Sequence, residues 1–207
     1  MVRKIPPDLE NPIDNILIEM GEYLSEYFKK LNLTANDLTT VSTFTGLYSI
    51  YLFIKKKYVM SAIFFIISHS FDCFDGFYAR KYNMVSNFGD CYDHLSDYII
   101  DGLMIYLIIK KYLKLPNNNL KKYIPILLIP LIGLMLVHFG CQEMYFDSTT
   151  SGNIILDCYK PMCPIDRNKS NDLRNFIKFS RFFGTGTYTL FICILILSSY
   201  SIDNDIH

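Results

Sequence analysis

Four aspartates inside one apolar stretch are the residues of this chain best suited to chemistry. Asp72 and Asp75 are three residues apart and Asp93 and Asp97 four apart, so each pair shares one face of a helix. Ionisable groups at membrane depth are costly unless they face one another, water or a metal ion. Two such helices packed together would repel through their carboxylates unless a cation lay between them. An oxygen-only set of this kind suits Mg²⁺, Mn²⁺ or Ca²⁺.

The residues between these aspartates favour a phosphate-containing ligand. Gly76 and Gly89 have no side chain and Ala79 a small one, which permits close approach by a nucleotide or a neighbouring helix. Arg80 carries a planar fork that suits a bidentate contact to phosphate. The alternative for Arg80 is an interfacial anchor that reaches toward lipid headgroups.

Together these residues follow the pattern D-x2-D-G-x2-A-R-x8-G-x3-D-x3-D, and every defining position is present. The pattern resembles the signature of the CDP-alcohol phosphatidyltransferases. Upstream, the stretch LTANDLTTVS resembles the Asn-x-x-Thr opening of the first membrane helix in that family.

The resemblance implies an enzyme that transfers a substituted phosphate group from a CDP-alcohol to an alcohol hydroxyl and releases CMP. It implies one or two Mg²⁺ or Mn²⁺ ions, held principally by Asp72, Asp75 and Asp93. Asp97 is implied as the general base and as a further metal ligand, two roles that the sequence does not separate. The donor nucleotide and phosphates are expected at Gly76, Ala79, Arg80 and Gly89.

Two substrate classes stay open. A CDP-diacylglycerol donor with a small polar acceptor is favoured, because the short chain resembles that branch of the family. The NPIDNILIEM opening and the Asp93-His94 pair resemble instead the enzymes that use CDP-choline or CDP-ethanolamine with diacylglycerol. A membrane cation transporter is the alternative from a different class, since intramembrane carboxylates also mark ion pathways. Transport, however, does not require the glycines and Arg80 at these spacings.

Several residues outside the signature are weaker candidates. Asp90 and Asp101 extend the Asp93/Asp97 face by one turn each way and are expected to support the metal ligands, with Gly102 indicating close packing. His69 and His94 lie off the shared faces and are expected to be packing or interface residues, whereas His138 follows no motif.

A second group of candidates is basic. Arg174, Lys178 and Arg181, with Arg167 and Lys169, precede or open the last apolar span. We expect an interfacial anchor there, with an anionic-substrate or headgroup site as the alternative. The following FFGTGTYTLF holds two glycines, consistent with tight helix packing or with room for a ligand.

The fold class expected is an all-α integral membrane protein of about five to six transmembrane helices, in one domain covering 1–207. Hydrophobic residues make up 51% of the 207 residues. Residues 12–31 place apolar and charged residues on opposite helix faces, which predicts an amphipathic interfacial helix. The membrane bundle is expected at 39–201, with apolar spans at 39–54, 58–79, 88–109, 123–145 and 178–201. The resemblance implies six spans, but 138–178 turns polar.

The net charge and the cysteines indicate which partners and which cellular compartment to expect. The formal net charge is zero, so nothing favours nucleic acid. We expect membrane lipid as a partner, with a homodimer left open, and an active site at the cytosolic face, where CDP-activated donors are made. Cys158 and Cys163 are expected to be free thiols, because a disulfide there requires an oxidising lumen.

Overall fold

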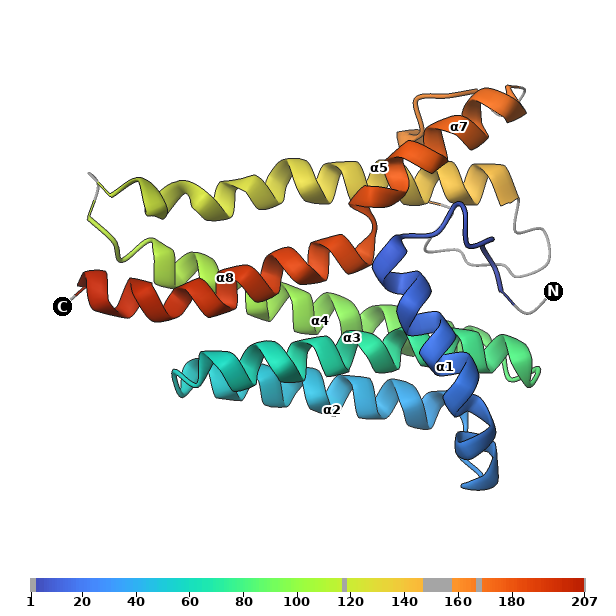
Figure 1. The fold of residues 1–207 in the computed structure, drawn as a ribbon, viewed down its shortest axis with the longest axis horizontal. Helices are drawn as coiled ribbons and strands as arrows, with labels where there is room; N and C mark the ends of the chain where they lie inside the picture. The colour runs from blue at the N-terminus through green and yellow to red at the C-terminus, as the bar shows by residue number, and fades with distance from the viewer. Residues whose placement is uncertain (1–2, 117–118, 147–157, 167–168, 207) are drawn as a thin grey trace.

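The structure is a computed structural model that describes residues 3–116, 119–146, 158–166 and 169–206. Every regular element in these ranges is helical. Figure 1 follows them in chain order: α1 (Pro12–Lys30), α2 (Ala35–Ile54), α3 (Tyr58–Lys81), α4 (Asn87–Tyr112), η1 (Leu120–Leu127), α5 (Leu128–Phe146), η2 (Lys160–Met162), α7 (Ser170–Ser180), η3 (Arg181–Phe183) and α8 (Thr185–Ile206).

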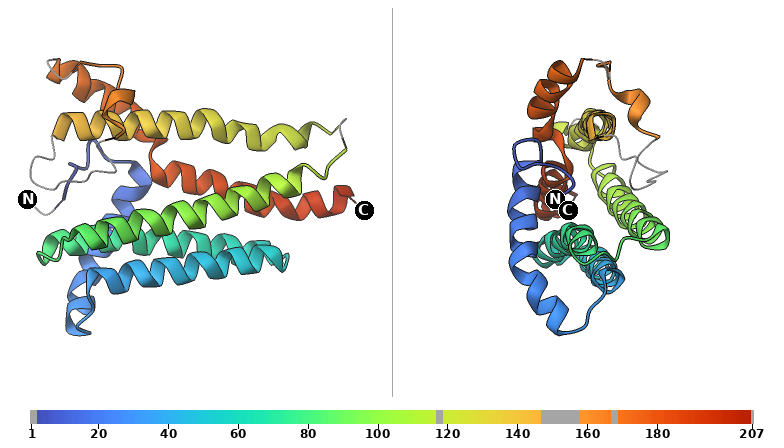
Figure 2. Two further views of the ribbon diagram at one scale, coloured as in Figure 1. Left: turned by 180° about the vertical axis from the view of Figure 1, so that it is seen from behind. Right: turned by 90° about the vertical axis from the view of Figure 1, so that its right-hand side faces the viewer.

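The long helices α2, α3, α4, α5 and α8 run side by side, and α1 crosses them near one end (Figures 1 and 2). The N-terminal segment, the connection between α3 and α4, and α7 lie at that end, while the C-terminus lies at the other. Among the described residues, three stretches are long and apolar enough to cross a membrane: Tyr58–Lys81, Leu120–Phe146 and Ser170–Asp203.

The boundaries of the helices that carry the aspartates follow from local capping. Thr34 and Asp37 form a capping box at the start of α2. The side chain of Ser86 accepts a hydrogen bond from the Gly89 amide, 3.0 Å away, at the start of α4. Between α3 and α4, Asn83 has a positive φ of 56°, which turns the chain so that α4 packs back on the bundle.

The contact between α2 and α3 is made by small polar residues. Ser42 and Ser68 each donate to the other's carbonyl oxygen, at 2.9 and 2.8 Å, and Ser49 and Ser61 do the same at 2.7 and 2.9 Å. Each hydroxyl therefore has a partner although it is buried. Small side chains let the two backbones approach closely, which fixes α3, and the two aspartates on it, against α2.

Helix α1 presents to the bundle some of the residues that the helical pattern assigned to its polar face. Asp14 and Ser25 are buried, whereas Ile16, Met20 and Tyr27 are about half exposed or more. Gly21 makes this packing possible, because a Cβ at that position would lie 2.7 Å from the Phe74 ring. The expected face assignment is therefore wrong for Asp14 and Ser25, since their polar groups find partners on α3 and α8.

The last apolar span begins later than expected. The predicted helix from residue 178 is interrupted: α7 ends at Ser180, η3 follows, and α8 starts at Thr185. Asn11 lies at this break, where its side-chain amide donates to the Arg181 carbonyl at 2.7 Å and to the Thr187 hydroxyl at 2.9 Å. Of the two alternatives for the glycines in this segment, the structure shows close packing, because a Cβ at Gly186 would lie 2.6 Å from Asp14 Oδ1 and one at Gly184 3.0 Å from Asn11 Cβ.

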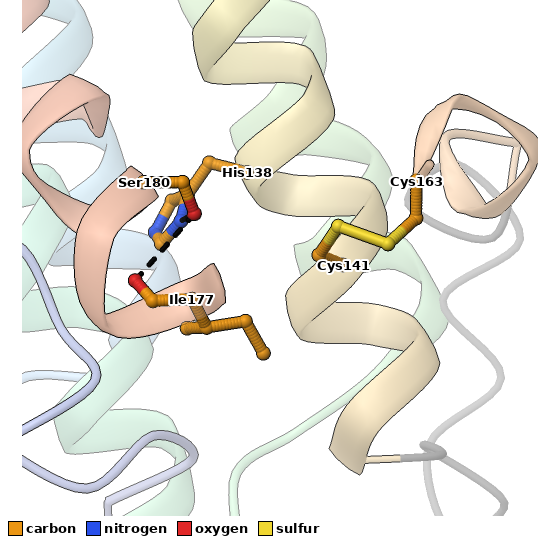
Figure 3. The surroundings of a disulfide bond; sticks show 5 residues. All are labelled: His138, Cys141, Cys163, Ile177 and Ser180. Carbon is orange, nitrogen blue, oxygen red and sulfur yellow. Dashed lines mark hydrogen bonds between the residues drawn. A yellow bond between two sulfur atoms is a disulfide. The ribbon is translucent and has the colours of Figure 1, made fainter. Parts of the chain in front are cut away.

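A disulfide joins Cys141 of α5 to Cys163, with a Cα–Cα distance of 4.9 Å. Figure 3 shows it beside the contact of α5 with α7, where His138 Nδ1 lies 2.9 Å from the Ser180 hydroxyl oxygen. The prediction of a free thiol is wrong for Cys163, whose partner Cys141 lies 22 residues away in the sequence. Cys158 forms no disulfide.

Gly186→Ala should loosen the docking of α1 on α8. The new methyl group would meet Asp14, Asn11 and Ile13 at less than 3.0 Å. Overpacking of this kind costs about 1–3 kcal/mol, so we expect a lower midpoint of thermal unfolding in detergent. Gly133→Ala is the matched control, because nothing lies within 4 Å of its added Cβ. Equal midpoints for the two variants would show that α1 is not held at Gly186.

Candidate metal and phosphate site

The structure brings the signature aspartates together from two helices. Asp72 and Asp75 come from α3 and Asp93 from α4, and one carboxylate oxygen of each lies within 4.8 Å of the others. Asp97, one turn further along α4, is likewise grouped with Asp93 within 4.8 Å. The four carboxylates, whose spacing placed each pair on one helix face, thus meet at the end of the bundle that α1 crosses (Figure 1).

These carboxylates fit a hard divalent cation. Asp93 Oδ1 is buried and has no hydrogen-bond partner among the described residues. No lysine or arginine in the described part of the chain forms a salt bridge with Asp75, Asp93 or Asp97. Carboxylates this close and this dehydrated are unstable without positive charge, and a donor set made only of oxygen is the one that Mg²⁺ and Mn²⁺ prefer.

Helix α2 supplies a partner for one of the aspartates. The hydroxyl of Thr39 donates to Asp75 Oδ2 at 2.5 Å, and both residues are buried. Asn36, one turn earlier on α2, lies against Gly89 of α4. A Cβ added at Gly89 would lie 2.9 Å from Asn36 Oδ1. The upstream Asn-x-x-Thr segment, noted only as a resemblance in sequence, is therefore part of the same site.

Arg80 is exposed, and it forms no hydrogen bond or ion pair with the residues that the structure describes. Its guanidinium nitrogens lie 3.5 Å from the position that a Cβ of residue 76 would take. A Cβ at residue 76 would make only ordinary van der Waals contact with the guanidinium, whereas one at residue 89 would crowd Asn36. Ala79 packs at the edge of the core formed by α1, α2 and α3. A guanidinium next to clustered carboxylates, without a partner of its own, is suited to a phosphate.

The expectation that His69 lies off the helix faces that carry the aspartates is wrong. Its Nε2 lies 2.9 Å from Asp14 Oδ1, and its Nδ1 lies 4.0 Å from Asp72 Oδ2. His69 precedes Asp72 by three residues, a spacing that places both on one helix face and was the available signal. Asp14 belongs to no motif and reaches the site only because α1 crosses α3.

Asp14 joins three helices through hydrogen bonds. Besides His69 on α3, it accepts from the Thr185 hydroxyl at 2.8 Å and from the Gly186 amide at 3.0 Å, both at the start of α8. Burial alone would raise the pKa of the Asp14 carboxyl, but the hydrogen bond and charge of His69 and these two donors hold it below its usual range. Asp14 is therefore an ionised anchor for the site.

The remaining acidic candidates differ in their surroundings. Asp90 Oδ1 lies 3.6 Å from His94 Nε2, one turn along α4. Asp101 lines a cavity deeper in the bundle. Gly102 beside it faces open space, with nothing within 4 Å of an added Cβ, so the predicted close packing there is wrong.

This cavity of about 50 Å³ lies directly behind the aspartates. Its lining combines three carboxylates, His69 and five hydroxyl groups with two apolar side chains: Ser42, Phe65, Ser68, His69, Asp72, Asp97, Ile100, Asp101, Thr185, Tyr188 and Thr189. A space of this size with polar groups on its wall has room for a few water molecules or for the hydroxyl end of a small ligand.

The basic candidates near α7 are partly engaged by the N-terminal segment. Arg174 pairs with Asp8 at 2.6 Å, and Arg181 donates to the carbonyl oxygens of Pro7 and Asp8 at 3.2 and 3.0 Å. Lys178 is exposed. Arg167 lies outside the described residues. The two arginines thus hold the segment that leads into α1, and a role toward an anionic ligand stays a prediction.

Comparison with known proteins decides the family. The sequence model of the CDP-alcohol phosphatidyltransferases matches residues 32–151. The chain belongs to the CDP-alcohol phosphatidyltransferase family. With its three long apolar helices, membership of this membrane-enzyme family makes it a membrane protein.

Three relatives carry the same printed name, CDP-diacylglycerol–glycerol-3-phosphate 3-phosphatidyltransferase. The protein from Rickettsia felis is 38% identical over 52 residues, which are 25% of this chain and 29% of the relative. That from Mycoplasma pneumoniae is 36% identical over 76 residues (36% and 34%), and that from Bacillus subtilis 38% over 57 residues (28% and 30%). The matches thus span about a third or less of each relative's length. No solved structure matches the chain.

Proposed function

We propose that this protein transfers a phosphatidyl group from CDP-diacylglycerol to the hydroxyl of a small polar alcohol and releases CMP. The observation that carries the proposal is the convergence of Asp72, Asp75 and Asp93, with one buried oxygen of Asp93 left without a partner. The printed names of the relatives support a CDP-diacylglycerol donor. They also make glycerol 3-phosphate the first acceptor to test.

Asp72, Asp75 and Asp93 are proposed to hold a Mg²⁺ or Mn²⁺ ion. When bound, such an ion neutralises charge on the diphosphate and on the departing CMP. Thr39 keeps the Asp75 carboxylate oriented through its hydrogen bond. The guanidinium of Arg80, which lies beside Gly76, is proposed to bind a phosphate oxygen of the donor.

Asp97 is proposed to accept the proton of the acceptor hydroxyl. It shares the cavity wall with Asp72, so a hydroxyl placed in the cavity can reach both the base and the reacting phosphate. Serine and threonine hydroxyls on the same wall can orient an alcohol. An anionic part of the acceptor is excluded from this carboxylate-rich wall by repulsion. It would point outward, toward the end of the bundle that carries Arg174, Lys178 and Arg181.

Asp97→Asn should separate proton transfer from metal binding. If Asp97 acts mainly as the base, turnover falls by about 10²–10⁴-fold, while Mn²⁺ still binds. CMP release by purified protein, with CDP-diacylglycerol, CDP-choline and CDP-ethanolamine as donors and with or without chelator, is the measurement. Asp172→Asn is the control. Asp172 is an exposed residue of α7, so this variant should retain wild-type turnover.

Wild-type turnover by Asp97→Asn would reject the assigned base, and lost Mn²⁺ binding would make Asp97 a ligand. Full CMP release in excess chelator would contradict the metal-dependent reaction itself. Activity with CDP-choline or CDP-ethanolamine alone would replace the proposed donor.

Arg80→Lys should weaken donor binding although the charge is kept. A guanidinium makes two parallel bonds to phosphate oxygens, whereas an ammonium acts as one point charge. Loss of one charge-assisted bond costs roughly 1.5–3 kcal/mol, or about tenfold or more in apparent affinity for the CDP-donor. Arg174→Lys is the matched control, because lysine can keep the ion pair with Asp8. Unchanged affinity in Arg80→Lys with a large loss in Arg174→Lys would move the phosphate site to α7.

We further propose that α2, α3, α4, α5 and α8 all cross the membrane, with the aspartates at the cytosolic face. Exposed apolar side chains of α1, including Ile16, Met20 and Tyr23, suit a helix that lies in the interface at that face.

Cysteine labelling tests this orientation. Lys178→Cys, at the end of the bundle that carries the aspartates, should be protected from a membrane-impermeant maleimide in intact cells. Lys57→Cys, at the opposite end, should react; both lysines are exposed. Labelling of Lys178→Cys in intact cells would place the aspartates on the other side of the membrane.

A further inference from the structure

A second group of potential metal ligands lies beside the aspartates but differs from them in chemistry. It consists of Asp14 from α1 and of His69 and Cys73, one turn apart on α3. The separations are 2.9 Å from Asp14 Oδ1 to His69 Nε2, 3.8 Å from Cys73 Sγ to His69 Nε2, and 4.0 Å from Cys73 Sγ to Asp14 Oδ1. One oxygen, one nitrogen and one sulfur thus form a small triangle.

This triangle fits a tetrahedral ion of the Zn²⁺ class. Bonds of about 2.0–2.3 Å from such an ion to oxygen, nitrogen and sulfur imply separations of roughly 3.3–3.7 Å between the ligand atoms. Each pair therefore needs to move by only about half an ångström. Imidazole and thiolate donors favour Zn²⁺ and Co²⁺ over Mg²⁺, which prefers sites made of oxygen.

The surroundings of the three residues also suit a ligated ion. Asp14 uses its other oxygen, Oδ2, to bind Thr185 and Gly186, so Oδ1 can turn to a metal without releasing α8. His69 Nδ1 faces Asp72 Oδ2, 4.0 Å away, which resembles the common arrangement in which the second ring nitrogen of a ligating histidine points at a carboxylate. The cavity wall at His69 and Thr185 provides access and room for a water as fourth ligand.

We propose that Asp14, His69 and Cys73 form a second metal site, selective for a thiophilic divalent ion such as Zn²⁺ or Co²⁺. Bound there, the ion fastens α1 to α3. It also places positive charge next to Asp72, which weakens the hold of the aspartates on Mg²⁺ or Mn²⁺. Because such coupling is reciprocal, the activating ion weakens binding at the second site in turn. Only this inhibitory consequence rests on the proposed function.

Cobalt absorption tests the site directly. Purified full-length protein, with excess Mg²⁺ present to fill the oxygen site, is titrated with Co²⁺ under reducing conditions. We expect a thiolate-to-cobalt charge-transfer band that saturates near one equivalent, since an oxygen-only site gives no such band. The band should vanish in Cys73→Ala and weaken at least tenfold in apparent affinity in His69→Gln. Cys91→Ala, which removes an exposed thiol of α4, should keep it.

Further measurements on Cys73→Ala distinguish loss of the second site from misfolding of the variant. Cys73→Ala should elute with the wild type on size exclusion and still bind Mn²⁺. The Zn²⁺ concentration that half-inhibits CMP release should rise at least tenfold in this variant. No band in the wild type, or an undiminished band in Cys73→Ala, overturns the site. Absence of CMP release with a normal cobalt band contradicts the proposed function and leaves the second site standing.

Discussion

Four carboxylate groups crowded between α3 and α4 repel one another, and most of the surrounding structure serves to hold them in place. Asp75 is buried, and Asp93 has a buried oxygen without a partner among the described residues. Like charges this close in a dehydrated bundle cannot all stay ionised unless a cation joins them. The same repulsion makes the site suited to a divalent ion, which we propose binds there and attracts the diphosphate of the donor.

The bundle resists this repulsion by fixing α3 from two sides. On one side, the reciprocal serine pairs and Thr39 bind α3 to α2. On the other, α1 lies across α3 and α8, where Asp14 bonds to His69, Thr185 and Gly186. Glycines at positions 21 and 186 permit these close approaches. Helix α1 thus links its exposed apolar residues to the aspartates, because His69, which bonds to Asp14, also lies 4.0 Å from Asp72.

Features set by local sequence could be predicted, and features set by long-range packing could not. The helical faces of the four aspartates follow from spacing alone, whereas the glycines before Tyr188 left close packing and a ligand site equally open. The partnership of Asp14 with His69 depends on where α1 crosses the bundle, which no periodicity encodes. The disulfide joins cysteines 22 residues apart, and the break between α7 and α8 is stabilised by Asn11, distant in sequence. In each case a polar residue finds its partner only after the helices have assembled.

We propose that the aspartates of α3 and α4 hold one cation between them and thereby bind the diphosphate of a CDP-alcohol. A crystal or cryo-EM structure of the protein with Mn²⁺ and CDP-diacylglycerol would test this proposal, with anomalous scattering used to locate manganese in the crystal. We expect manganese among Asp72, Asp75 and Asp93, in contact with the diphosphate, and Arg80 on a phosphate oxygen. Manganese elsewhere in the molecule, or a diphosphate bound away from these residues, would contradict it.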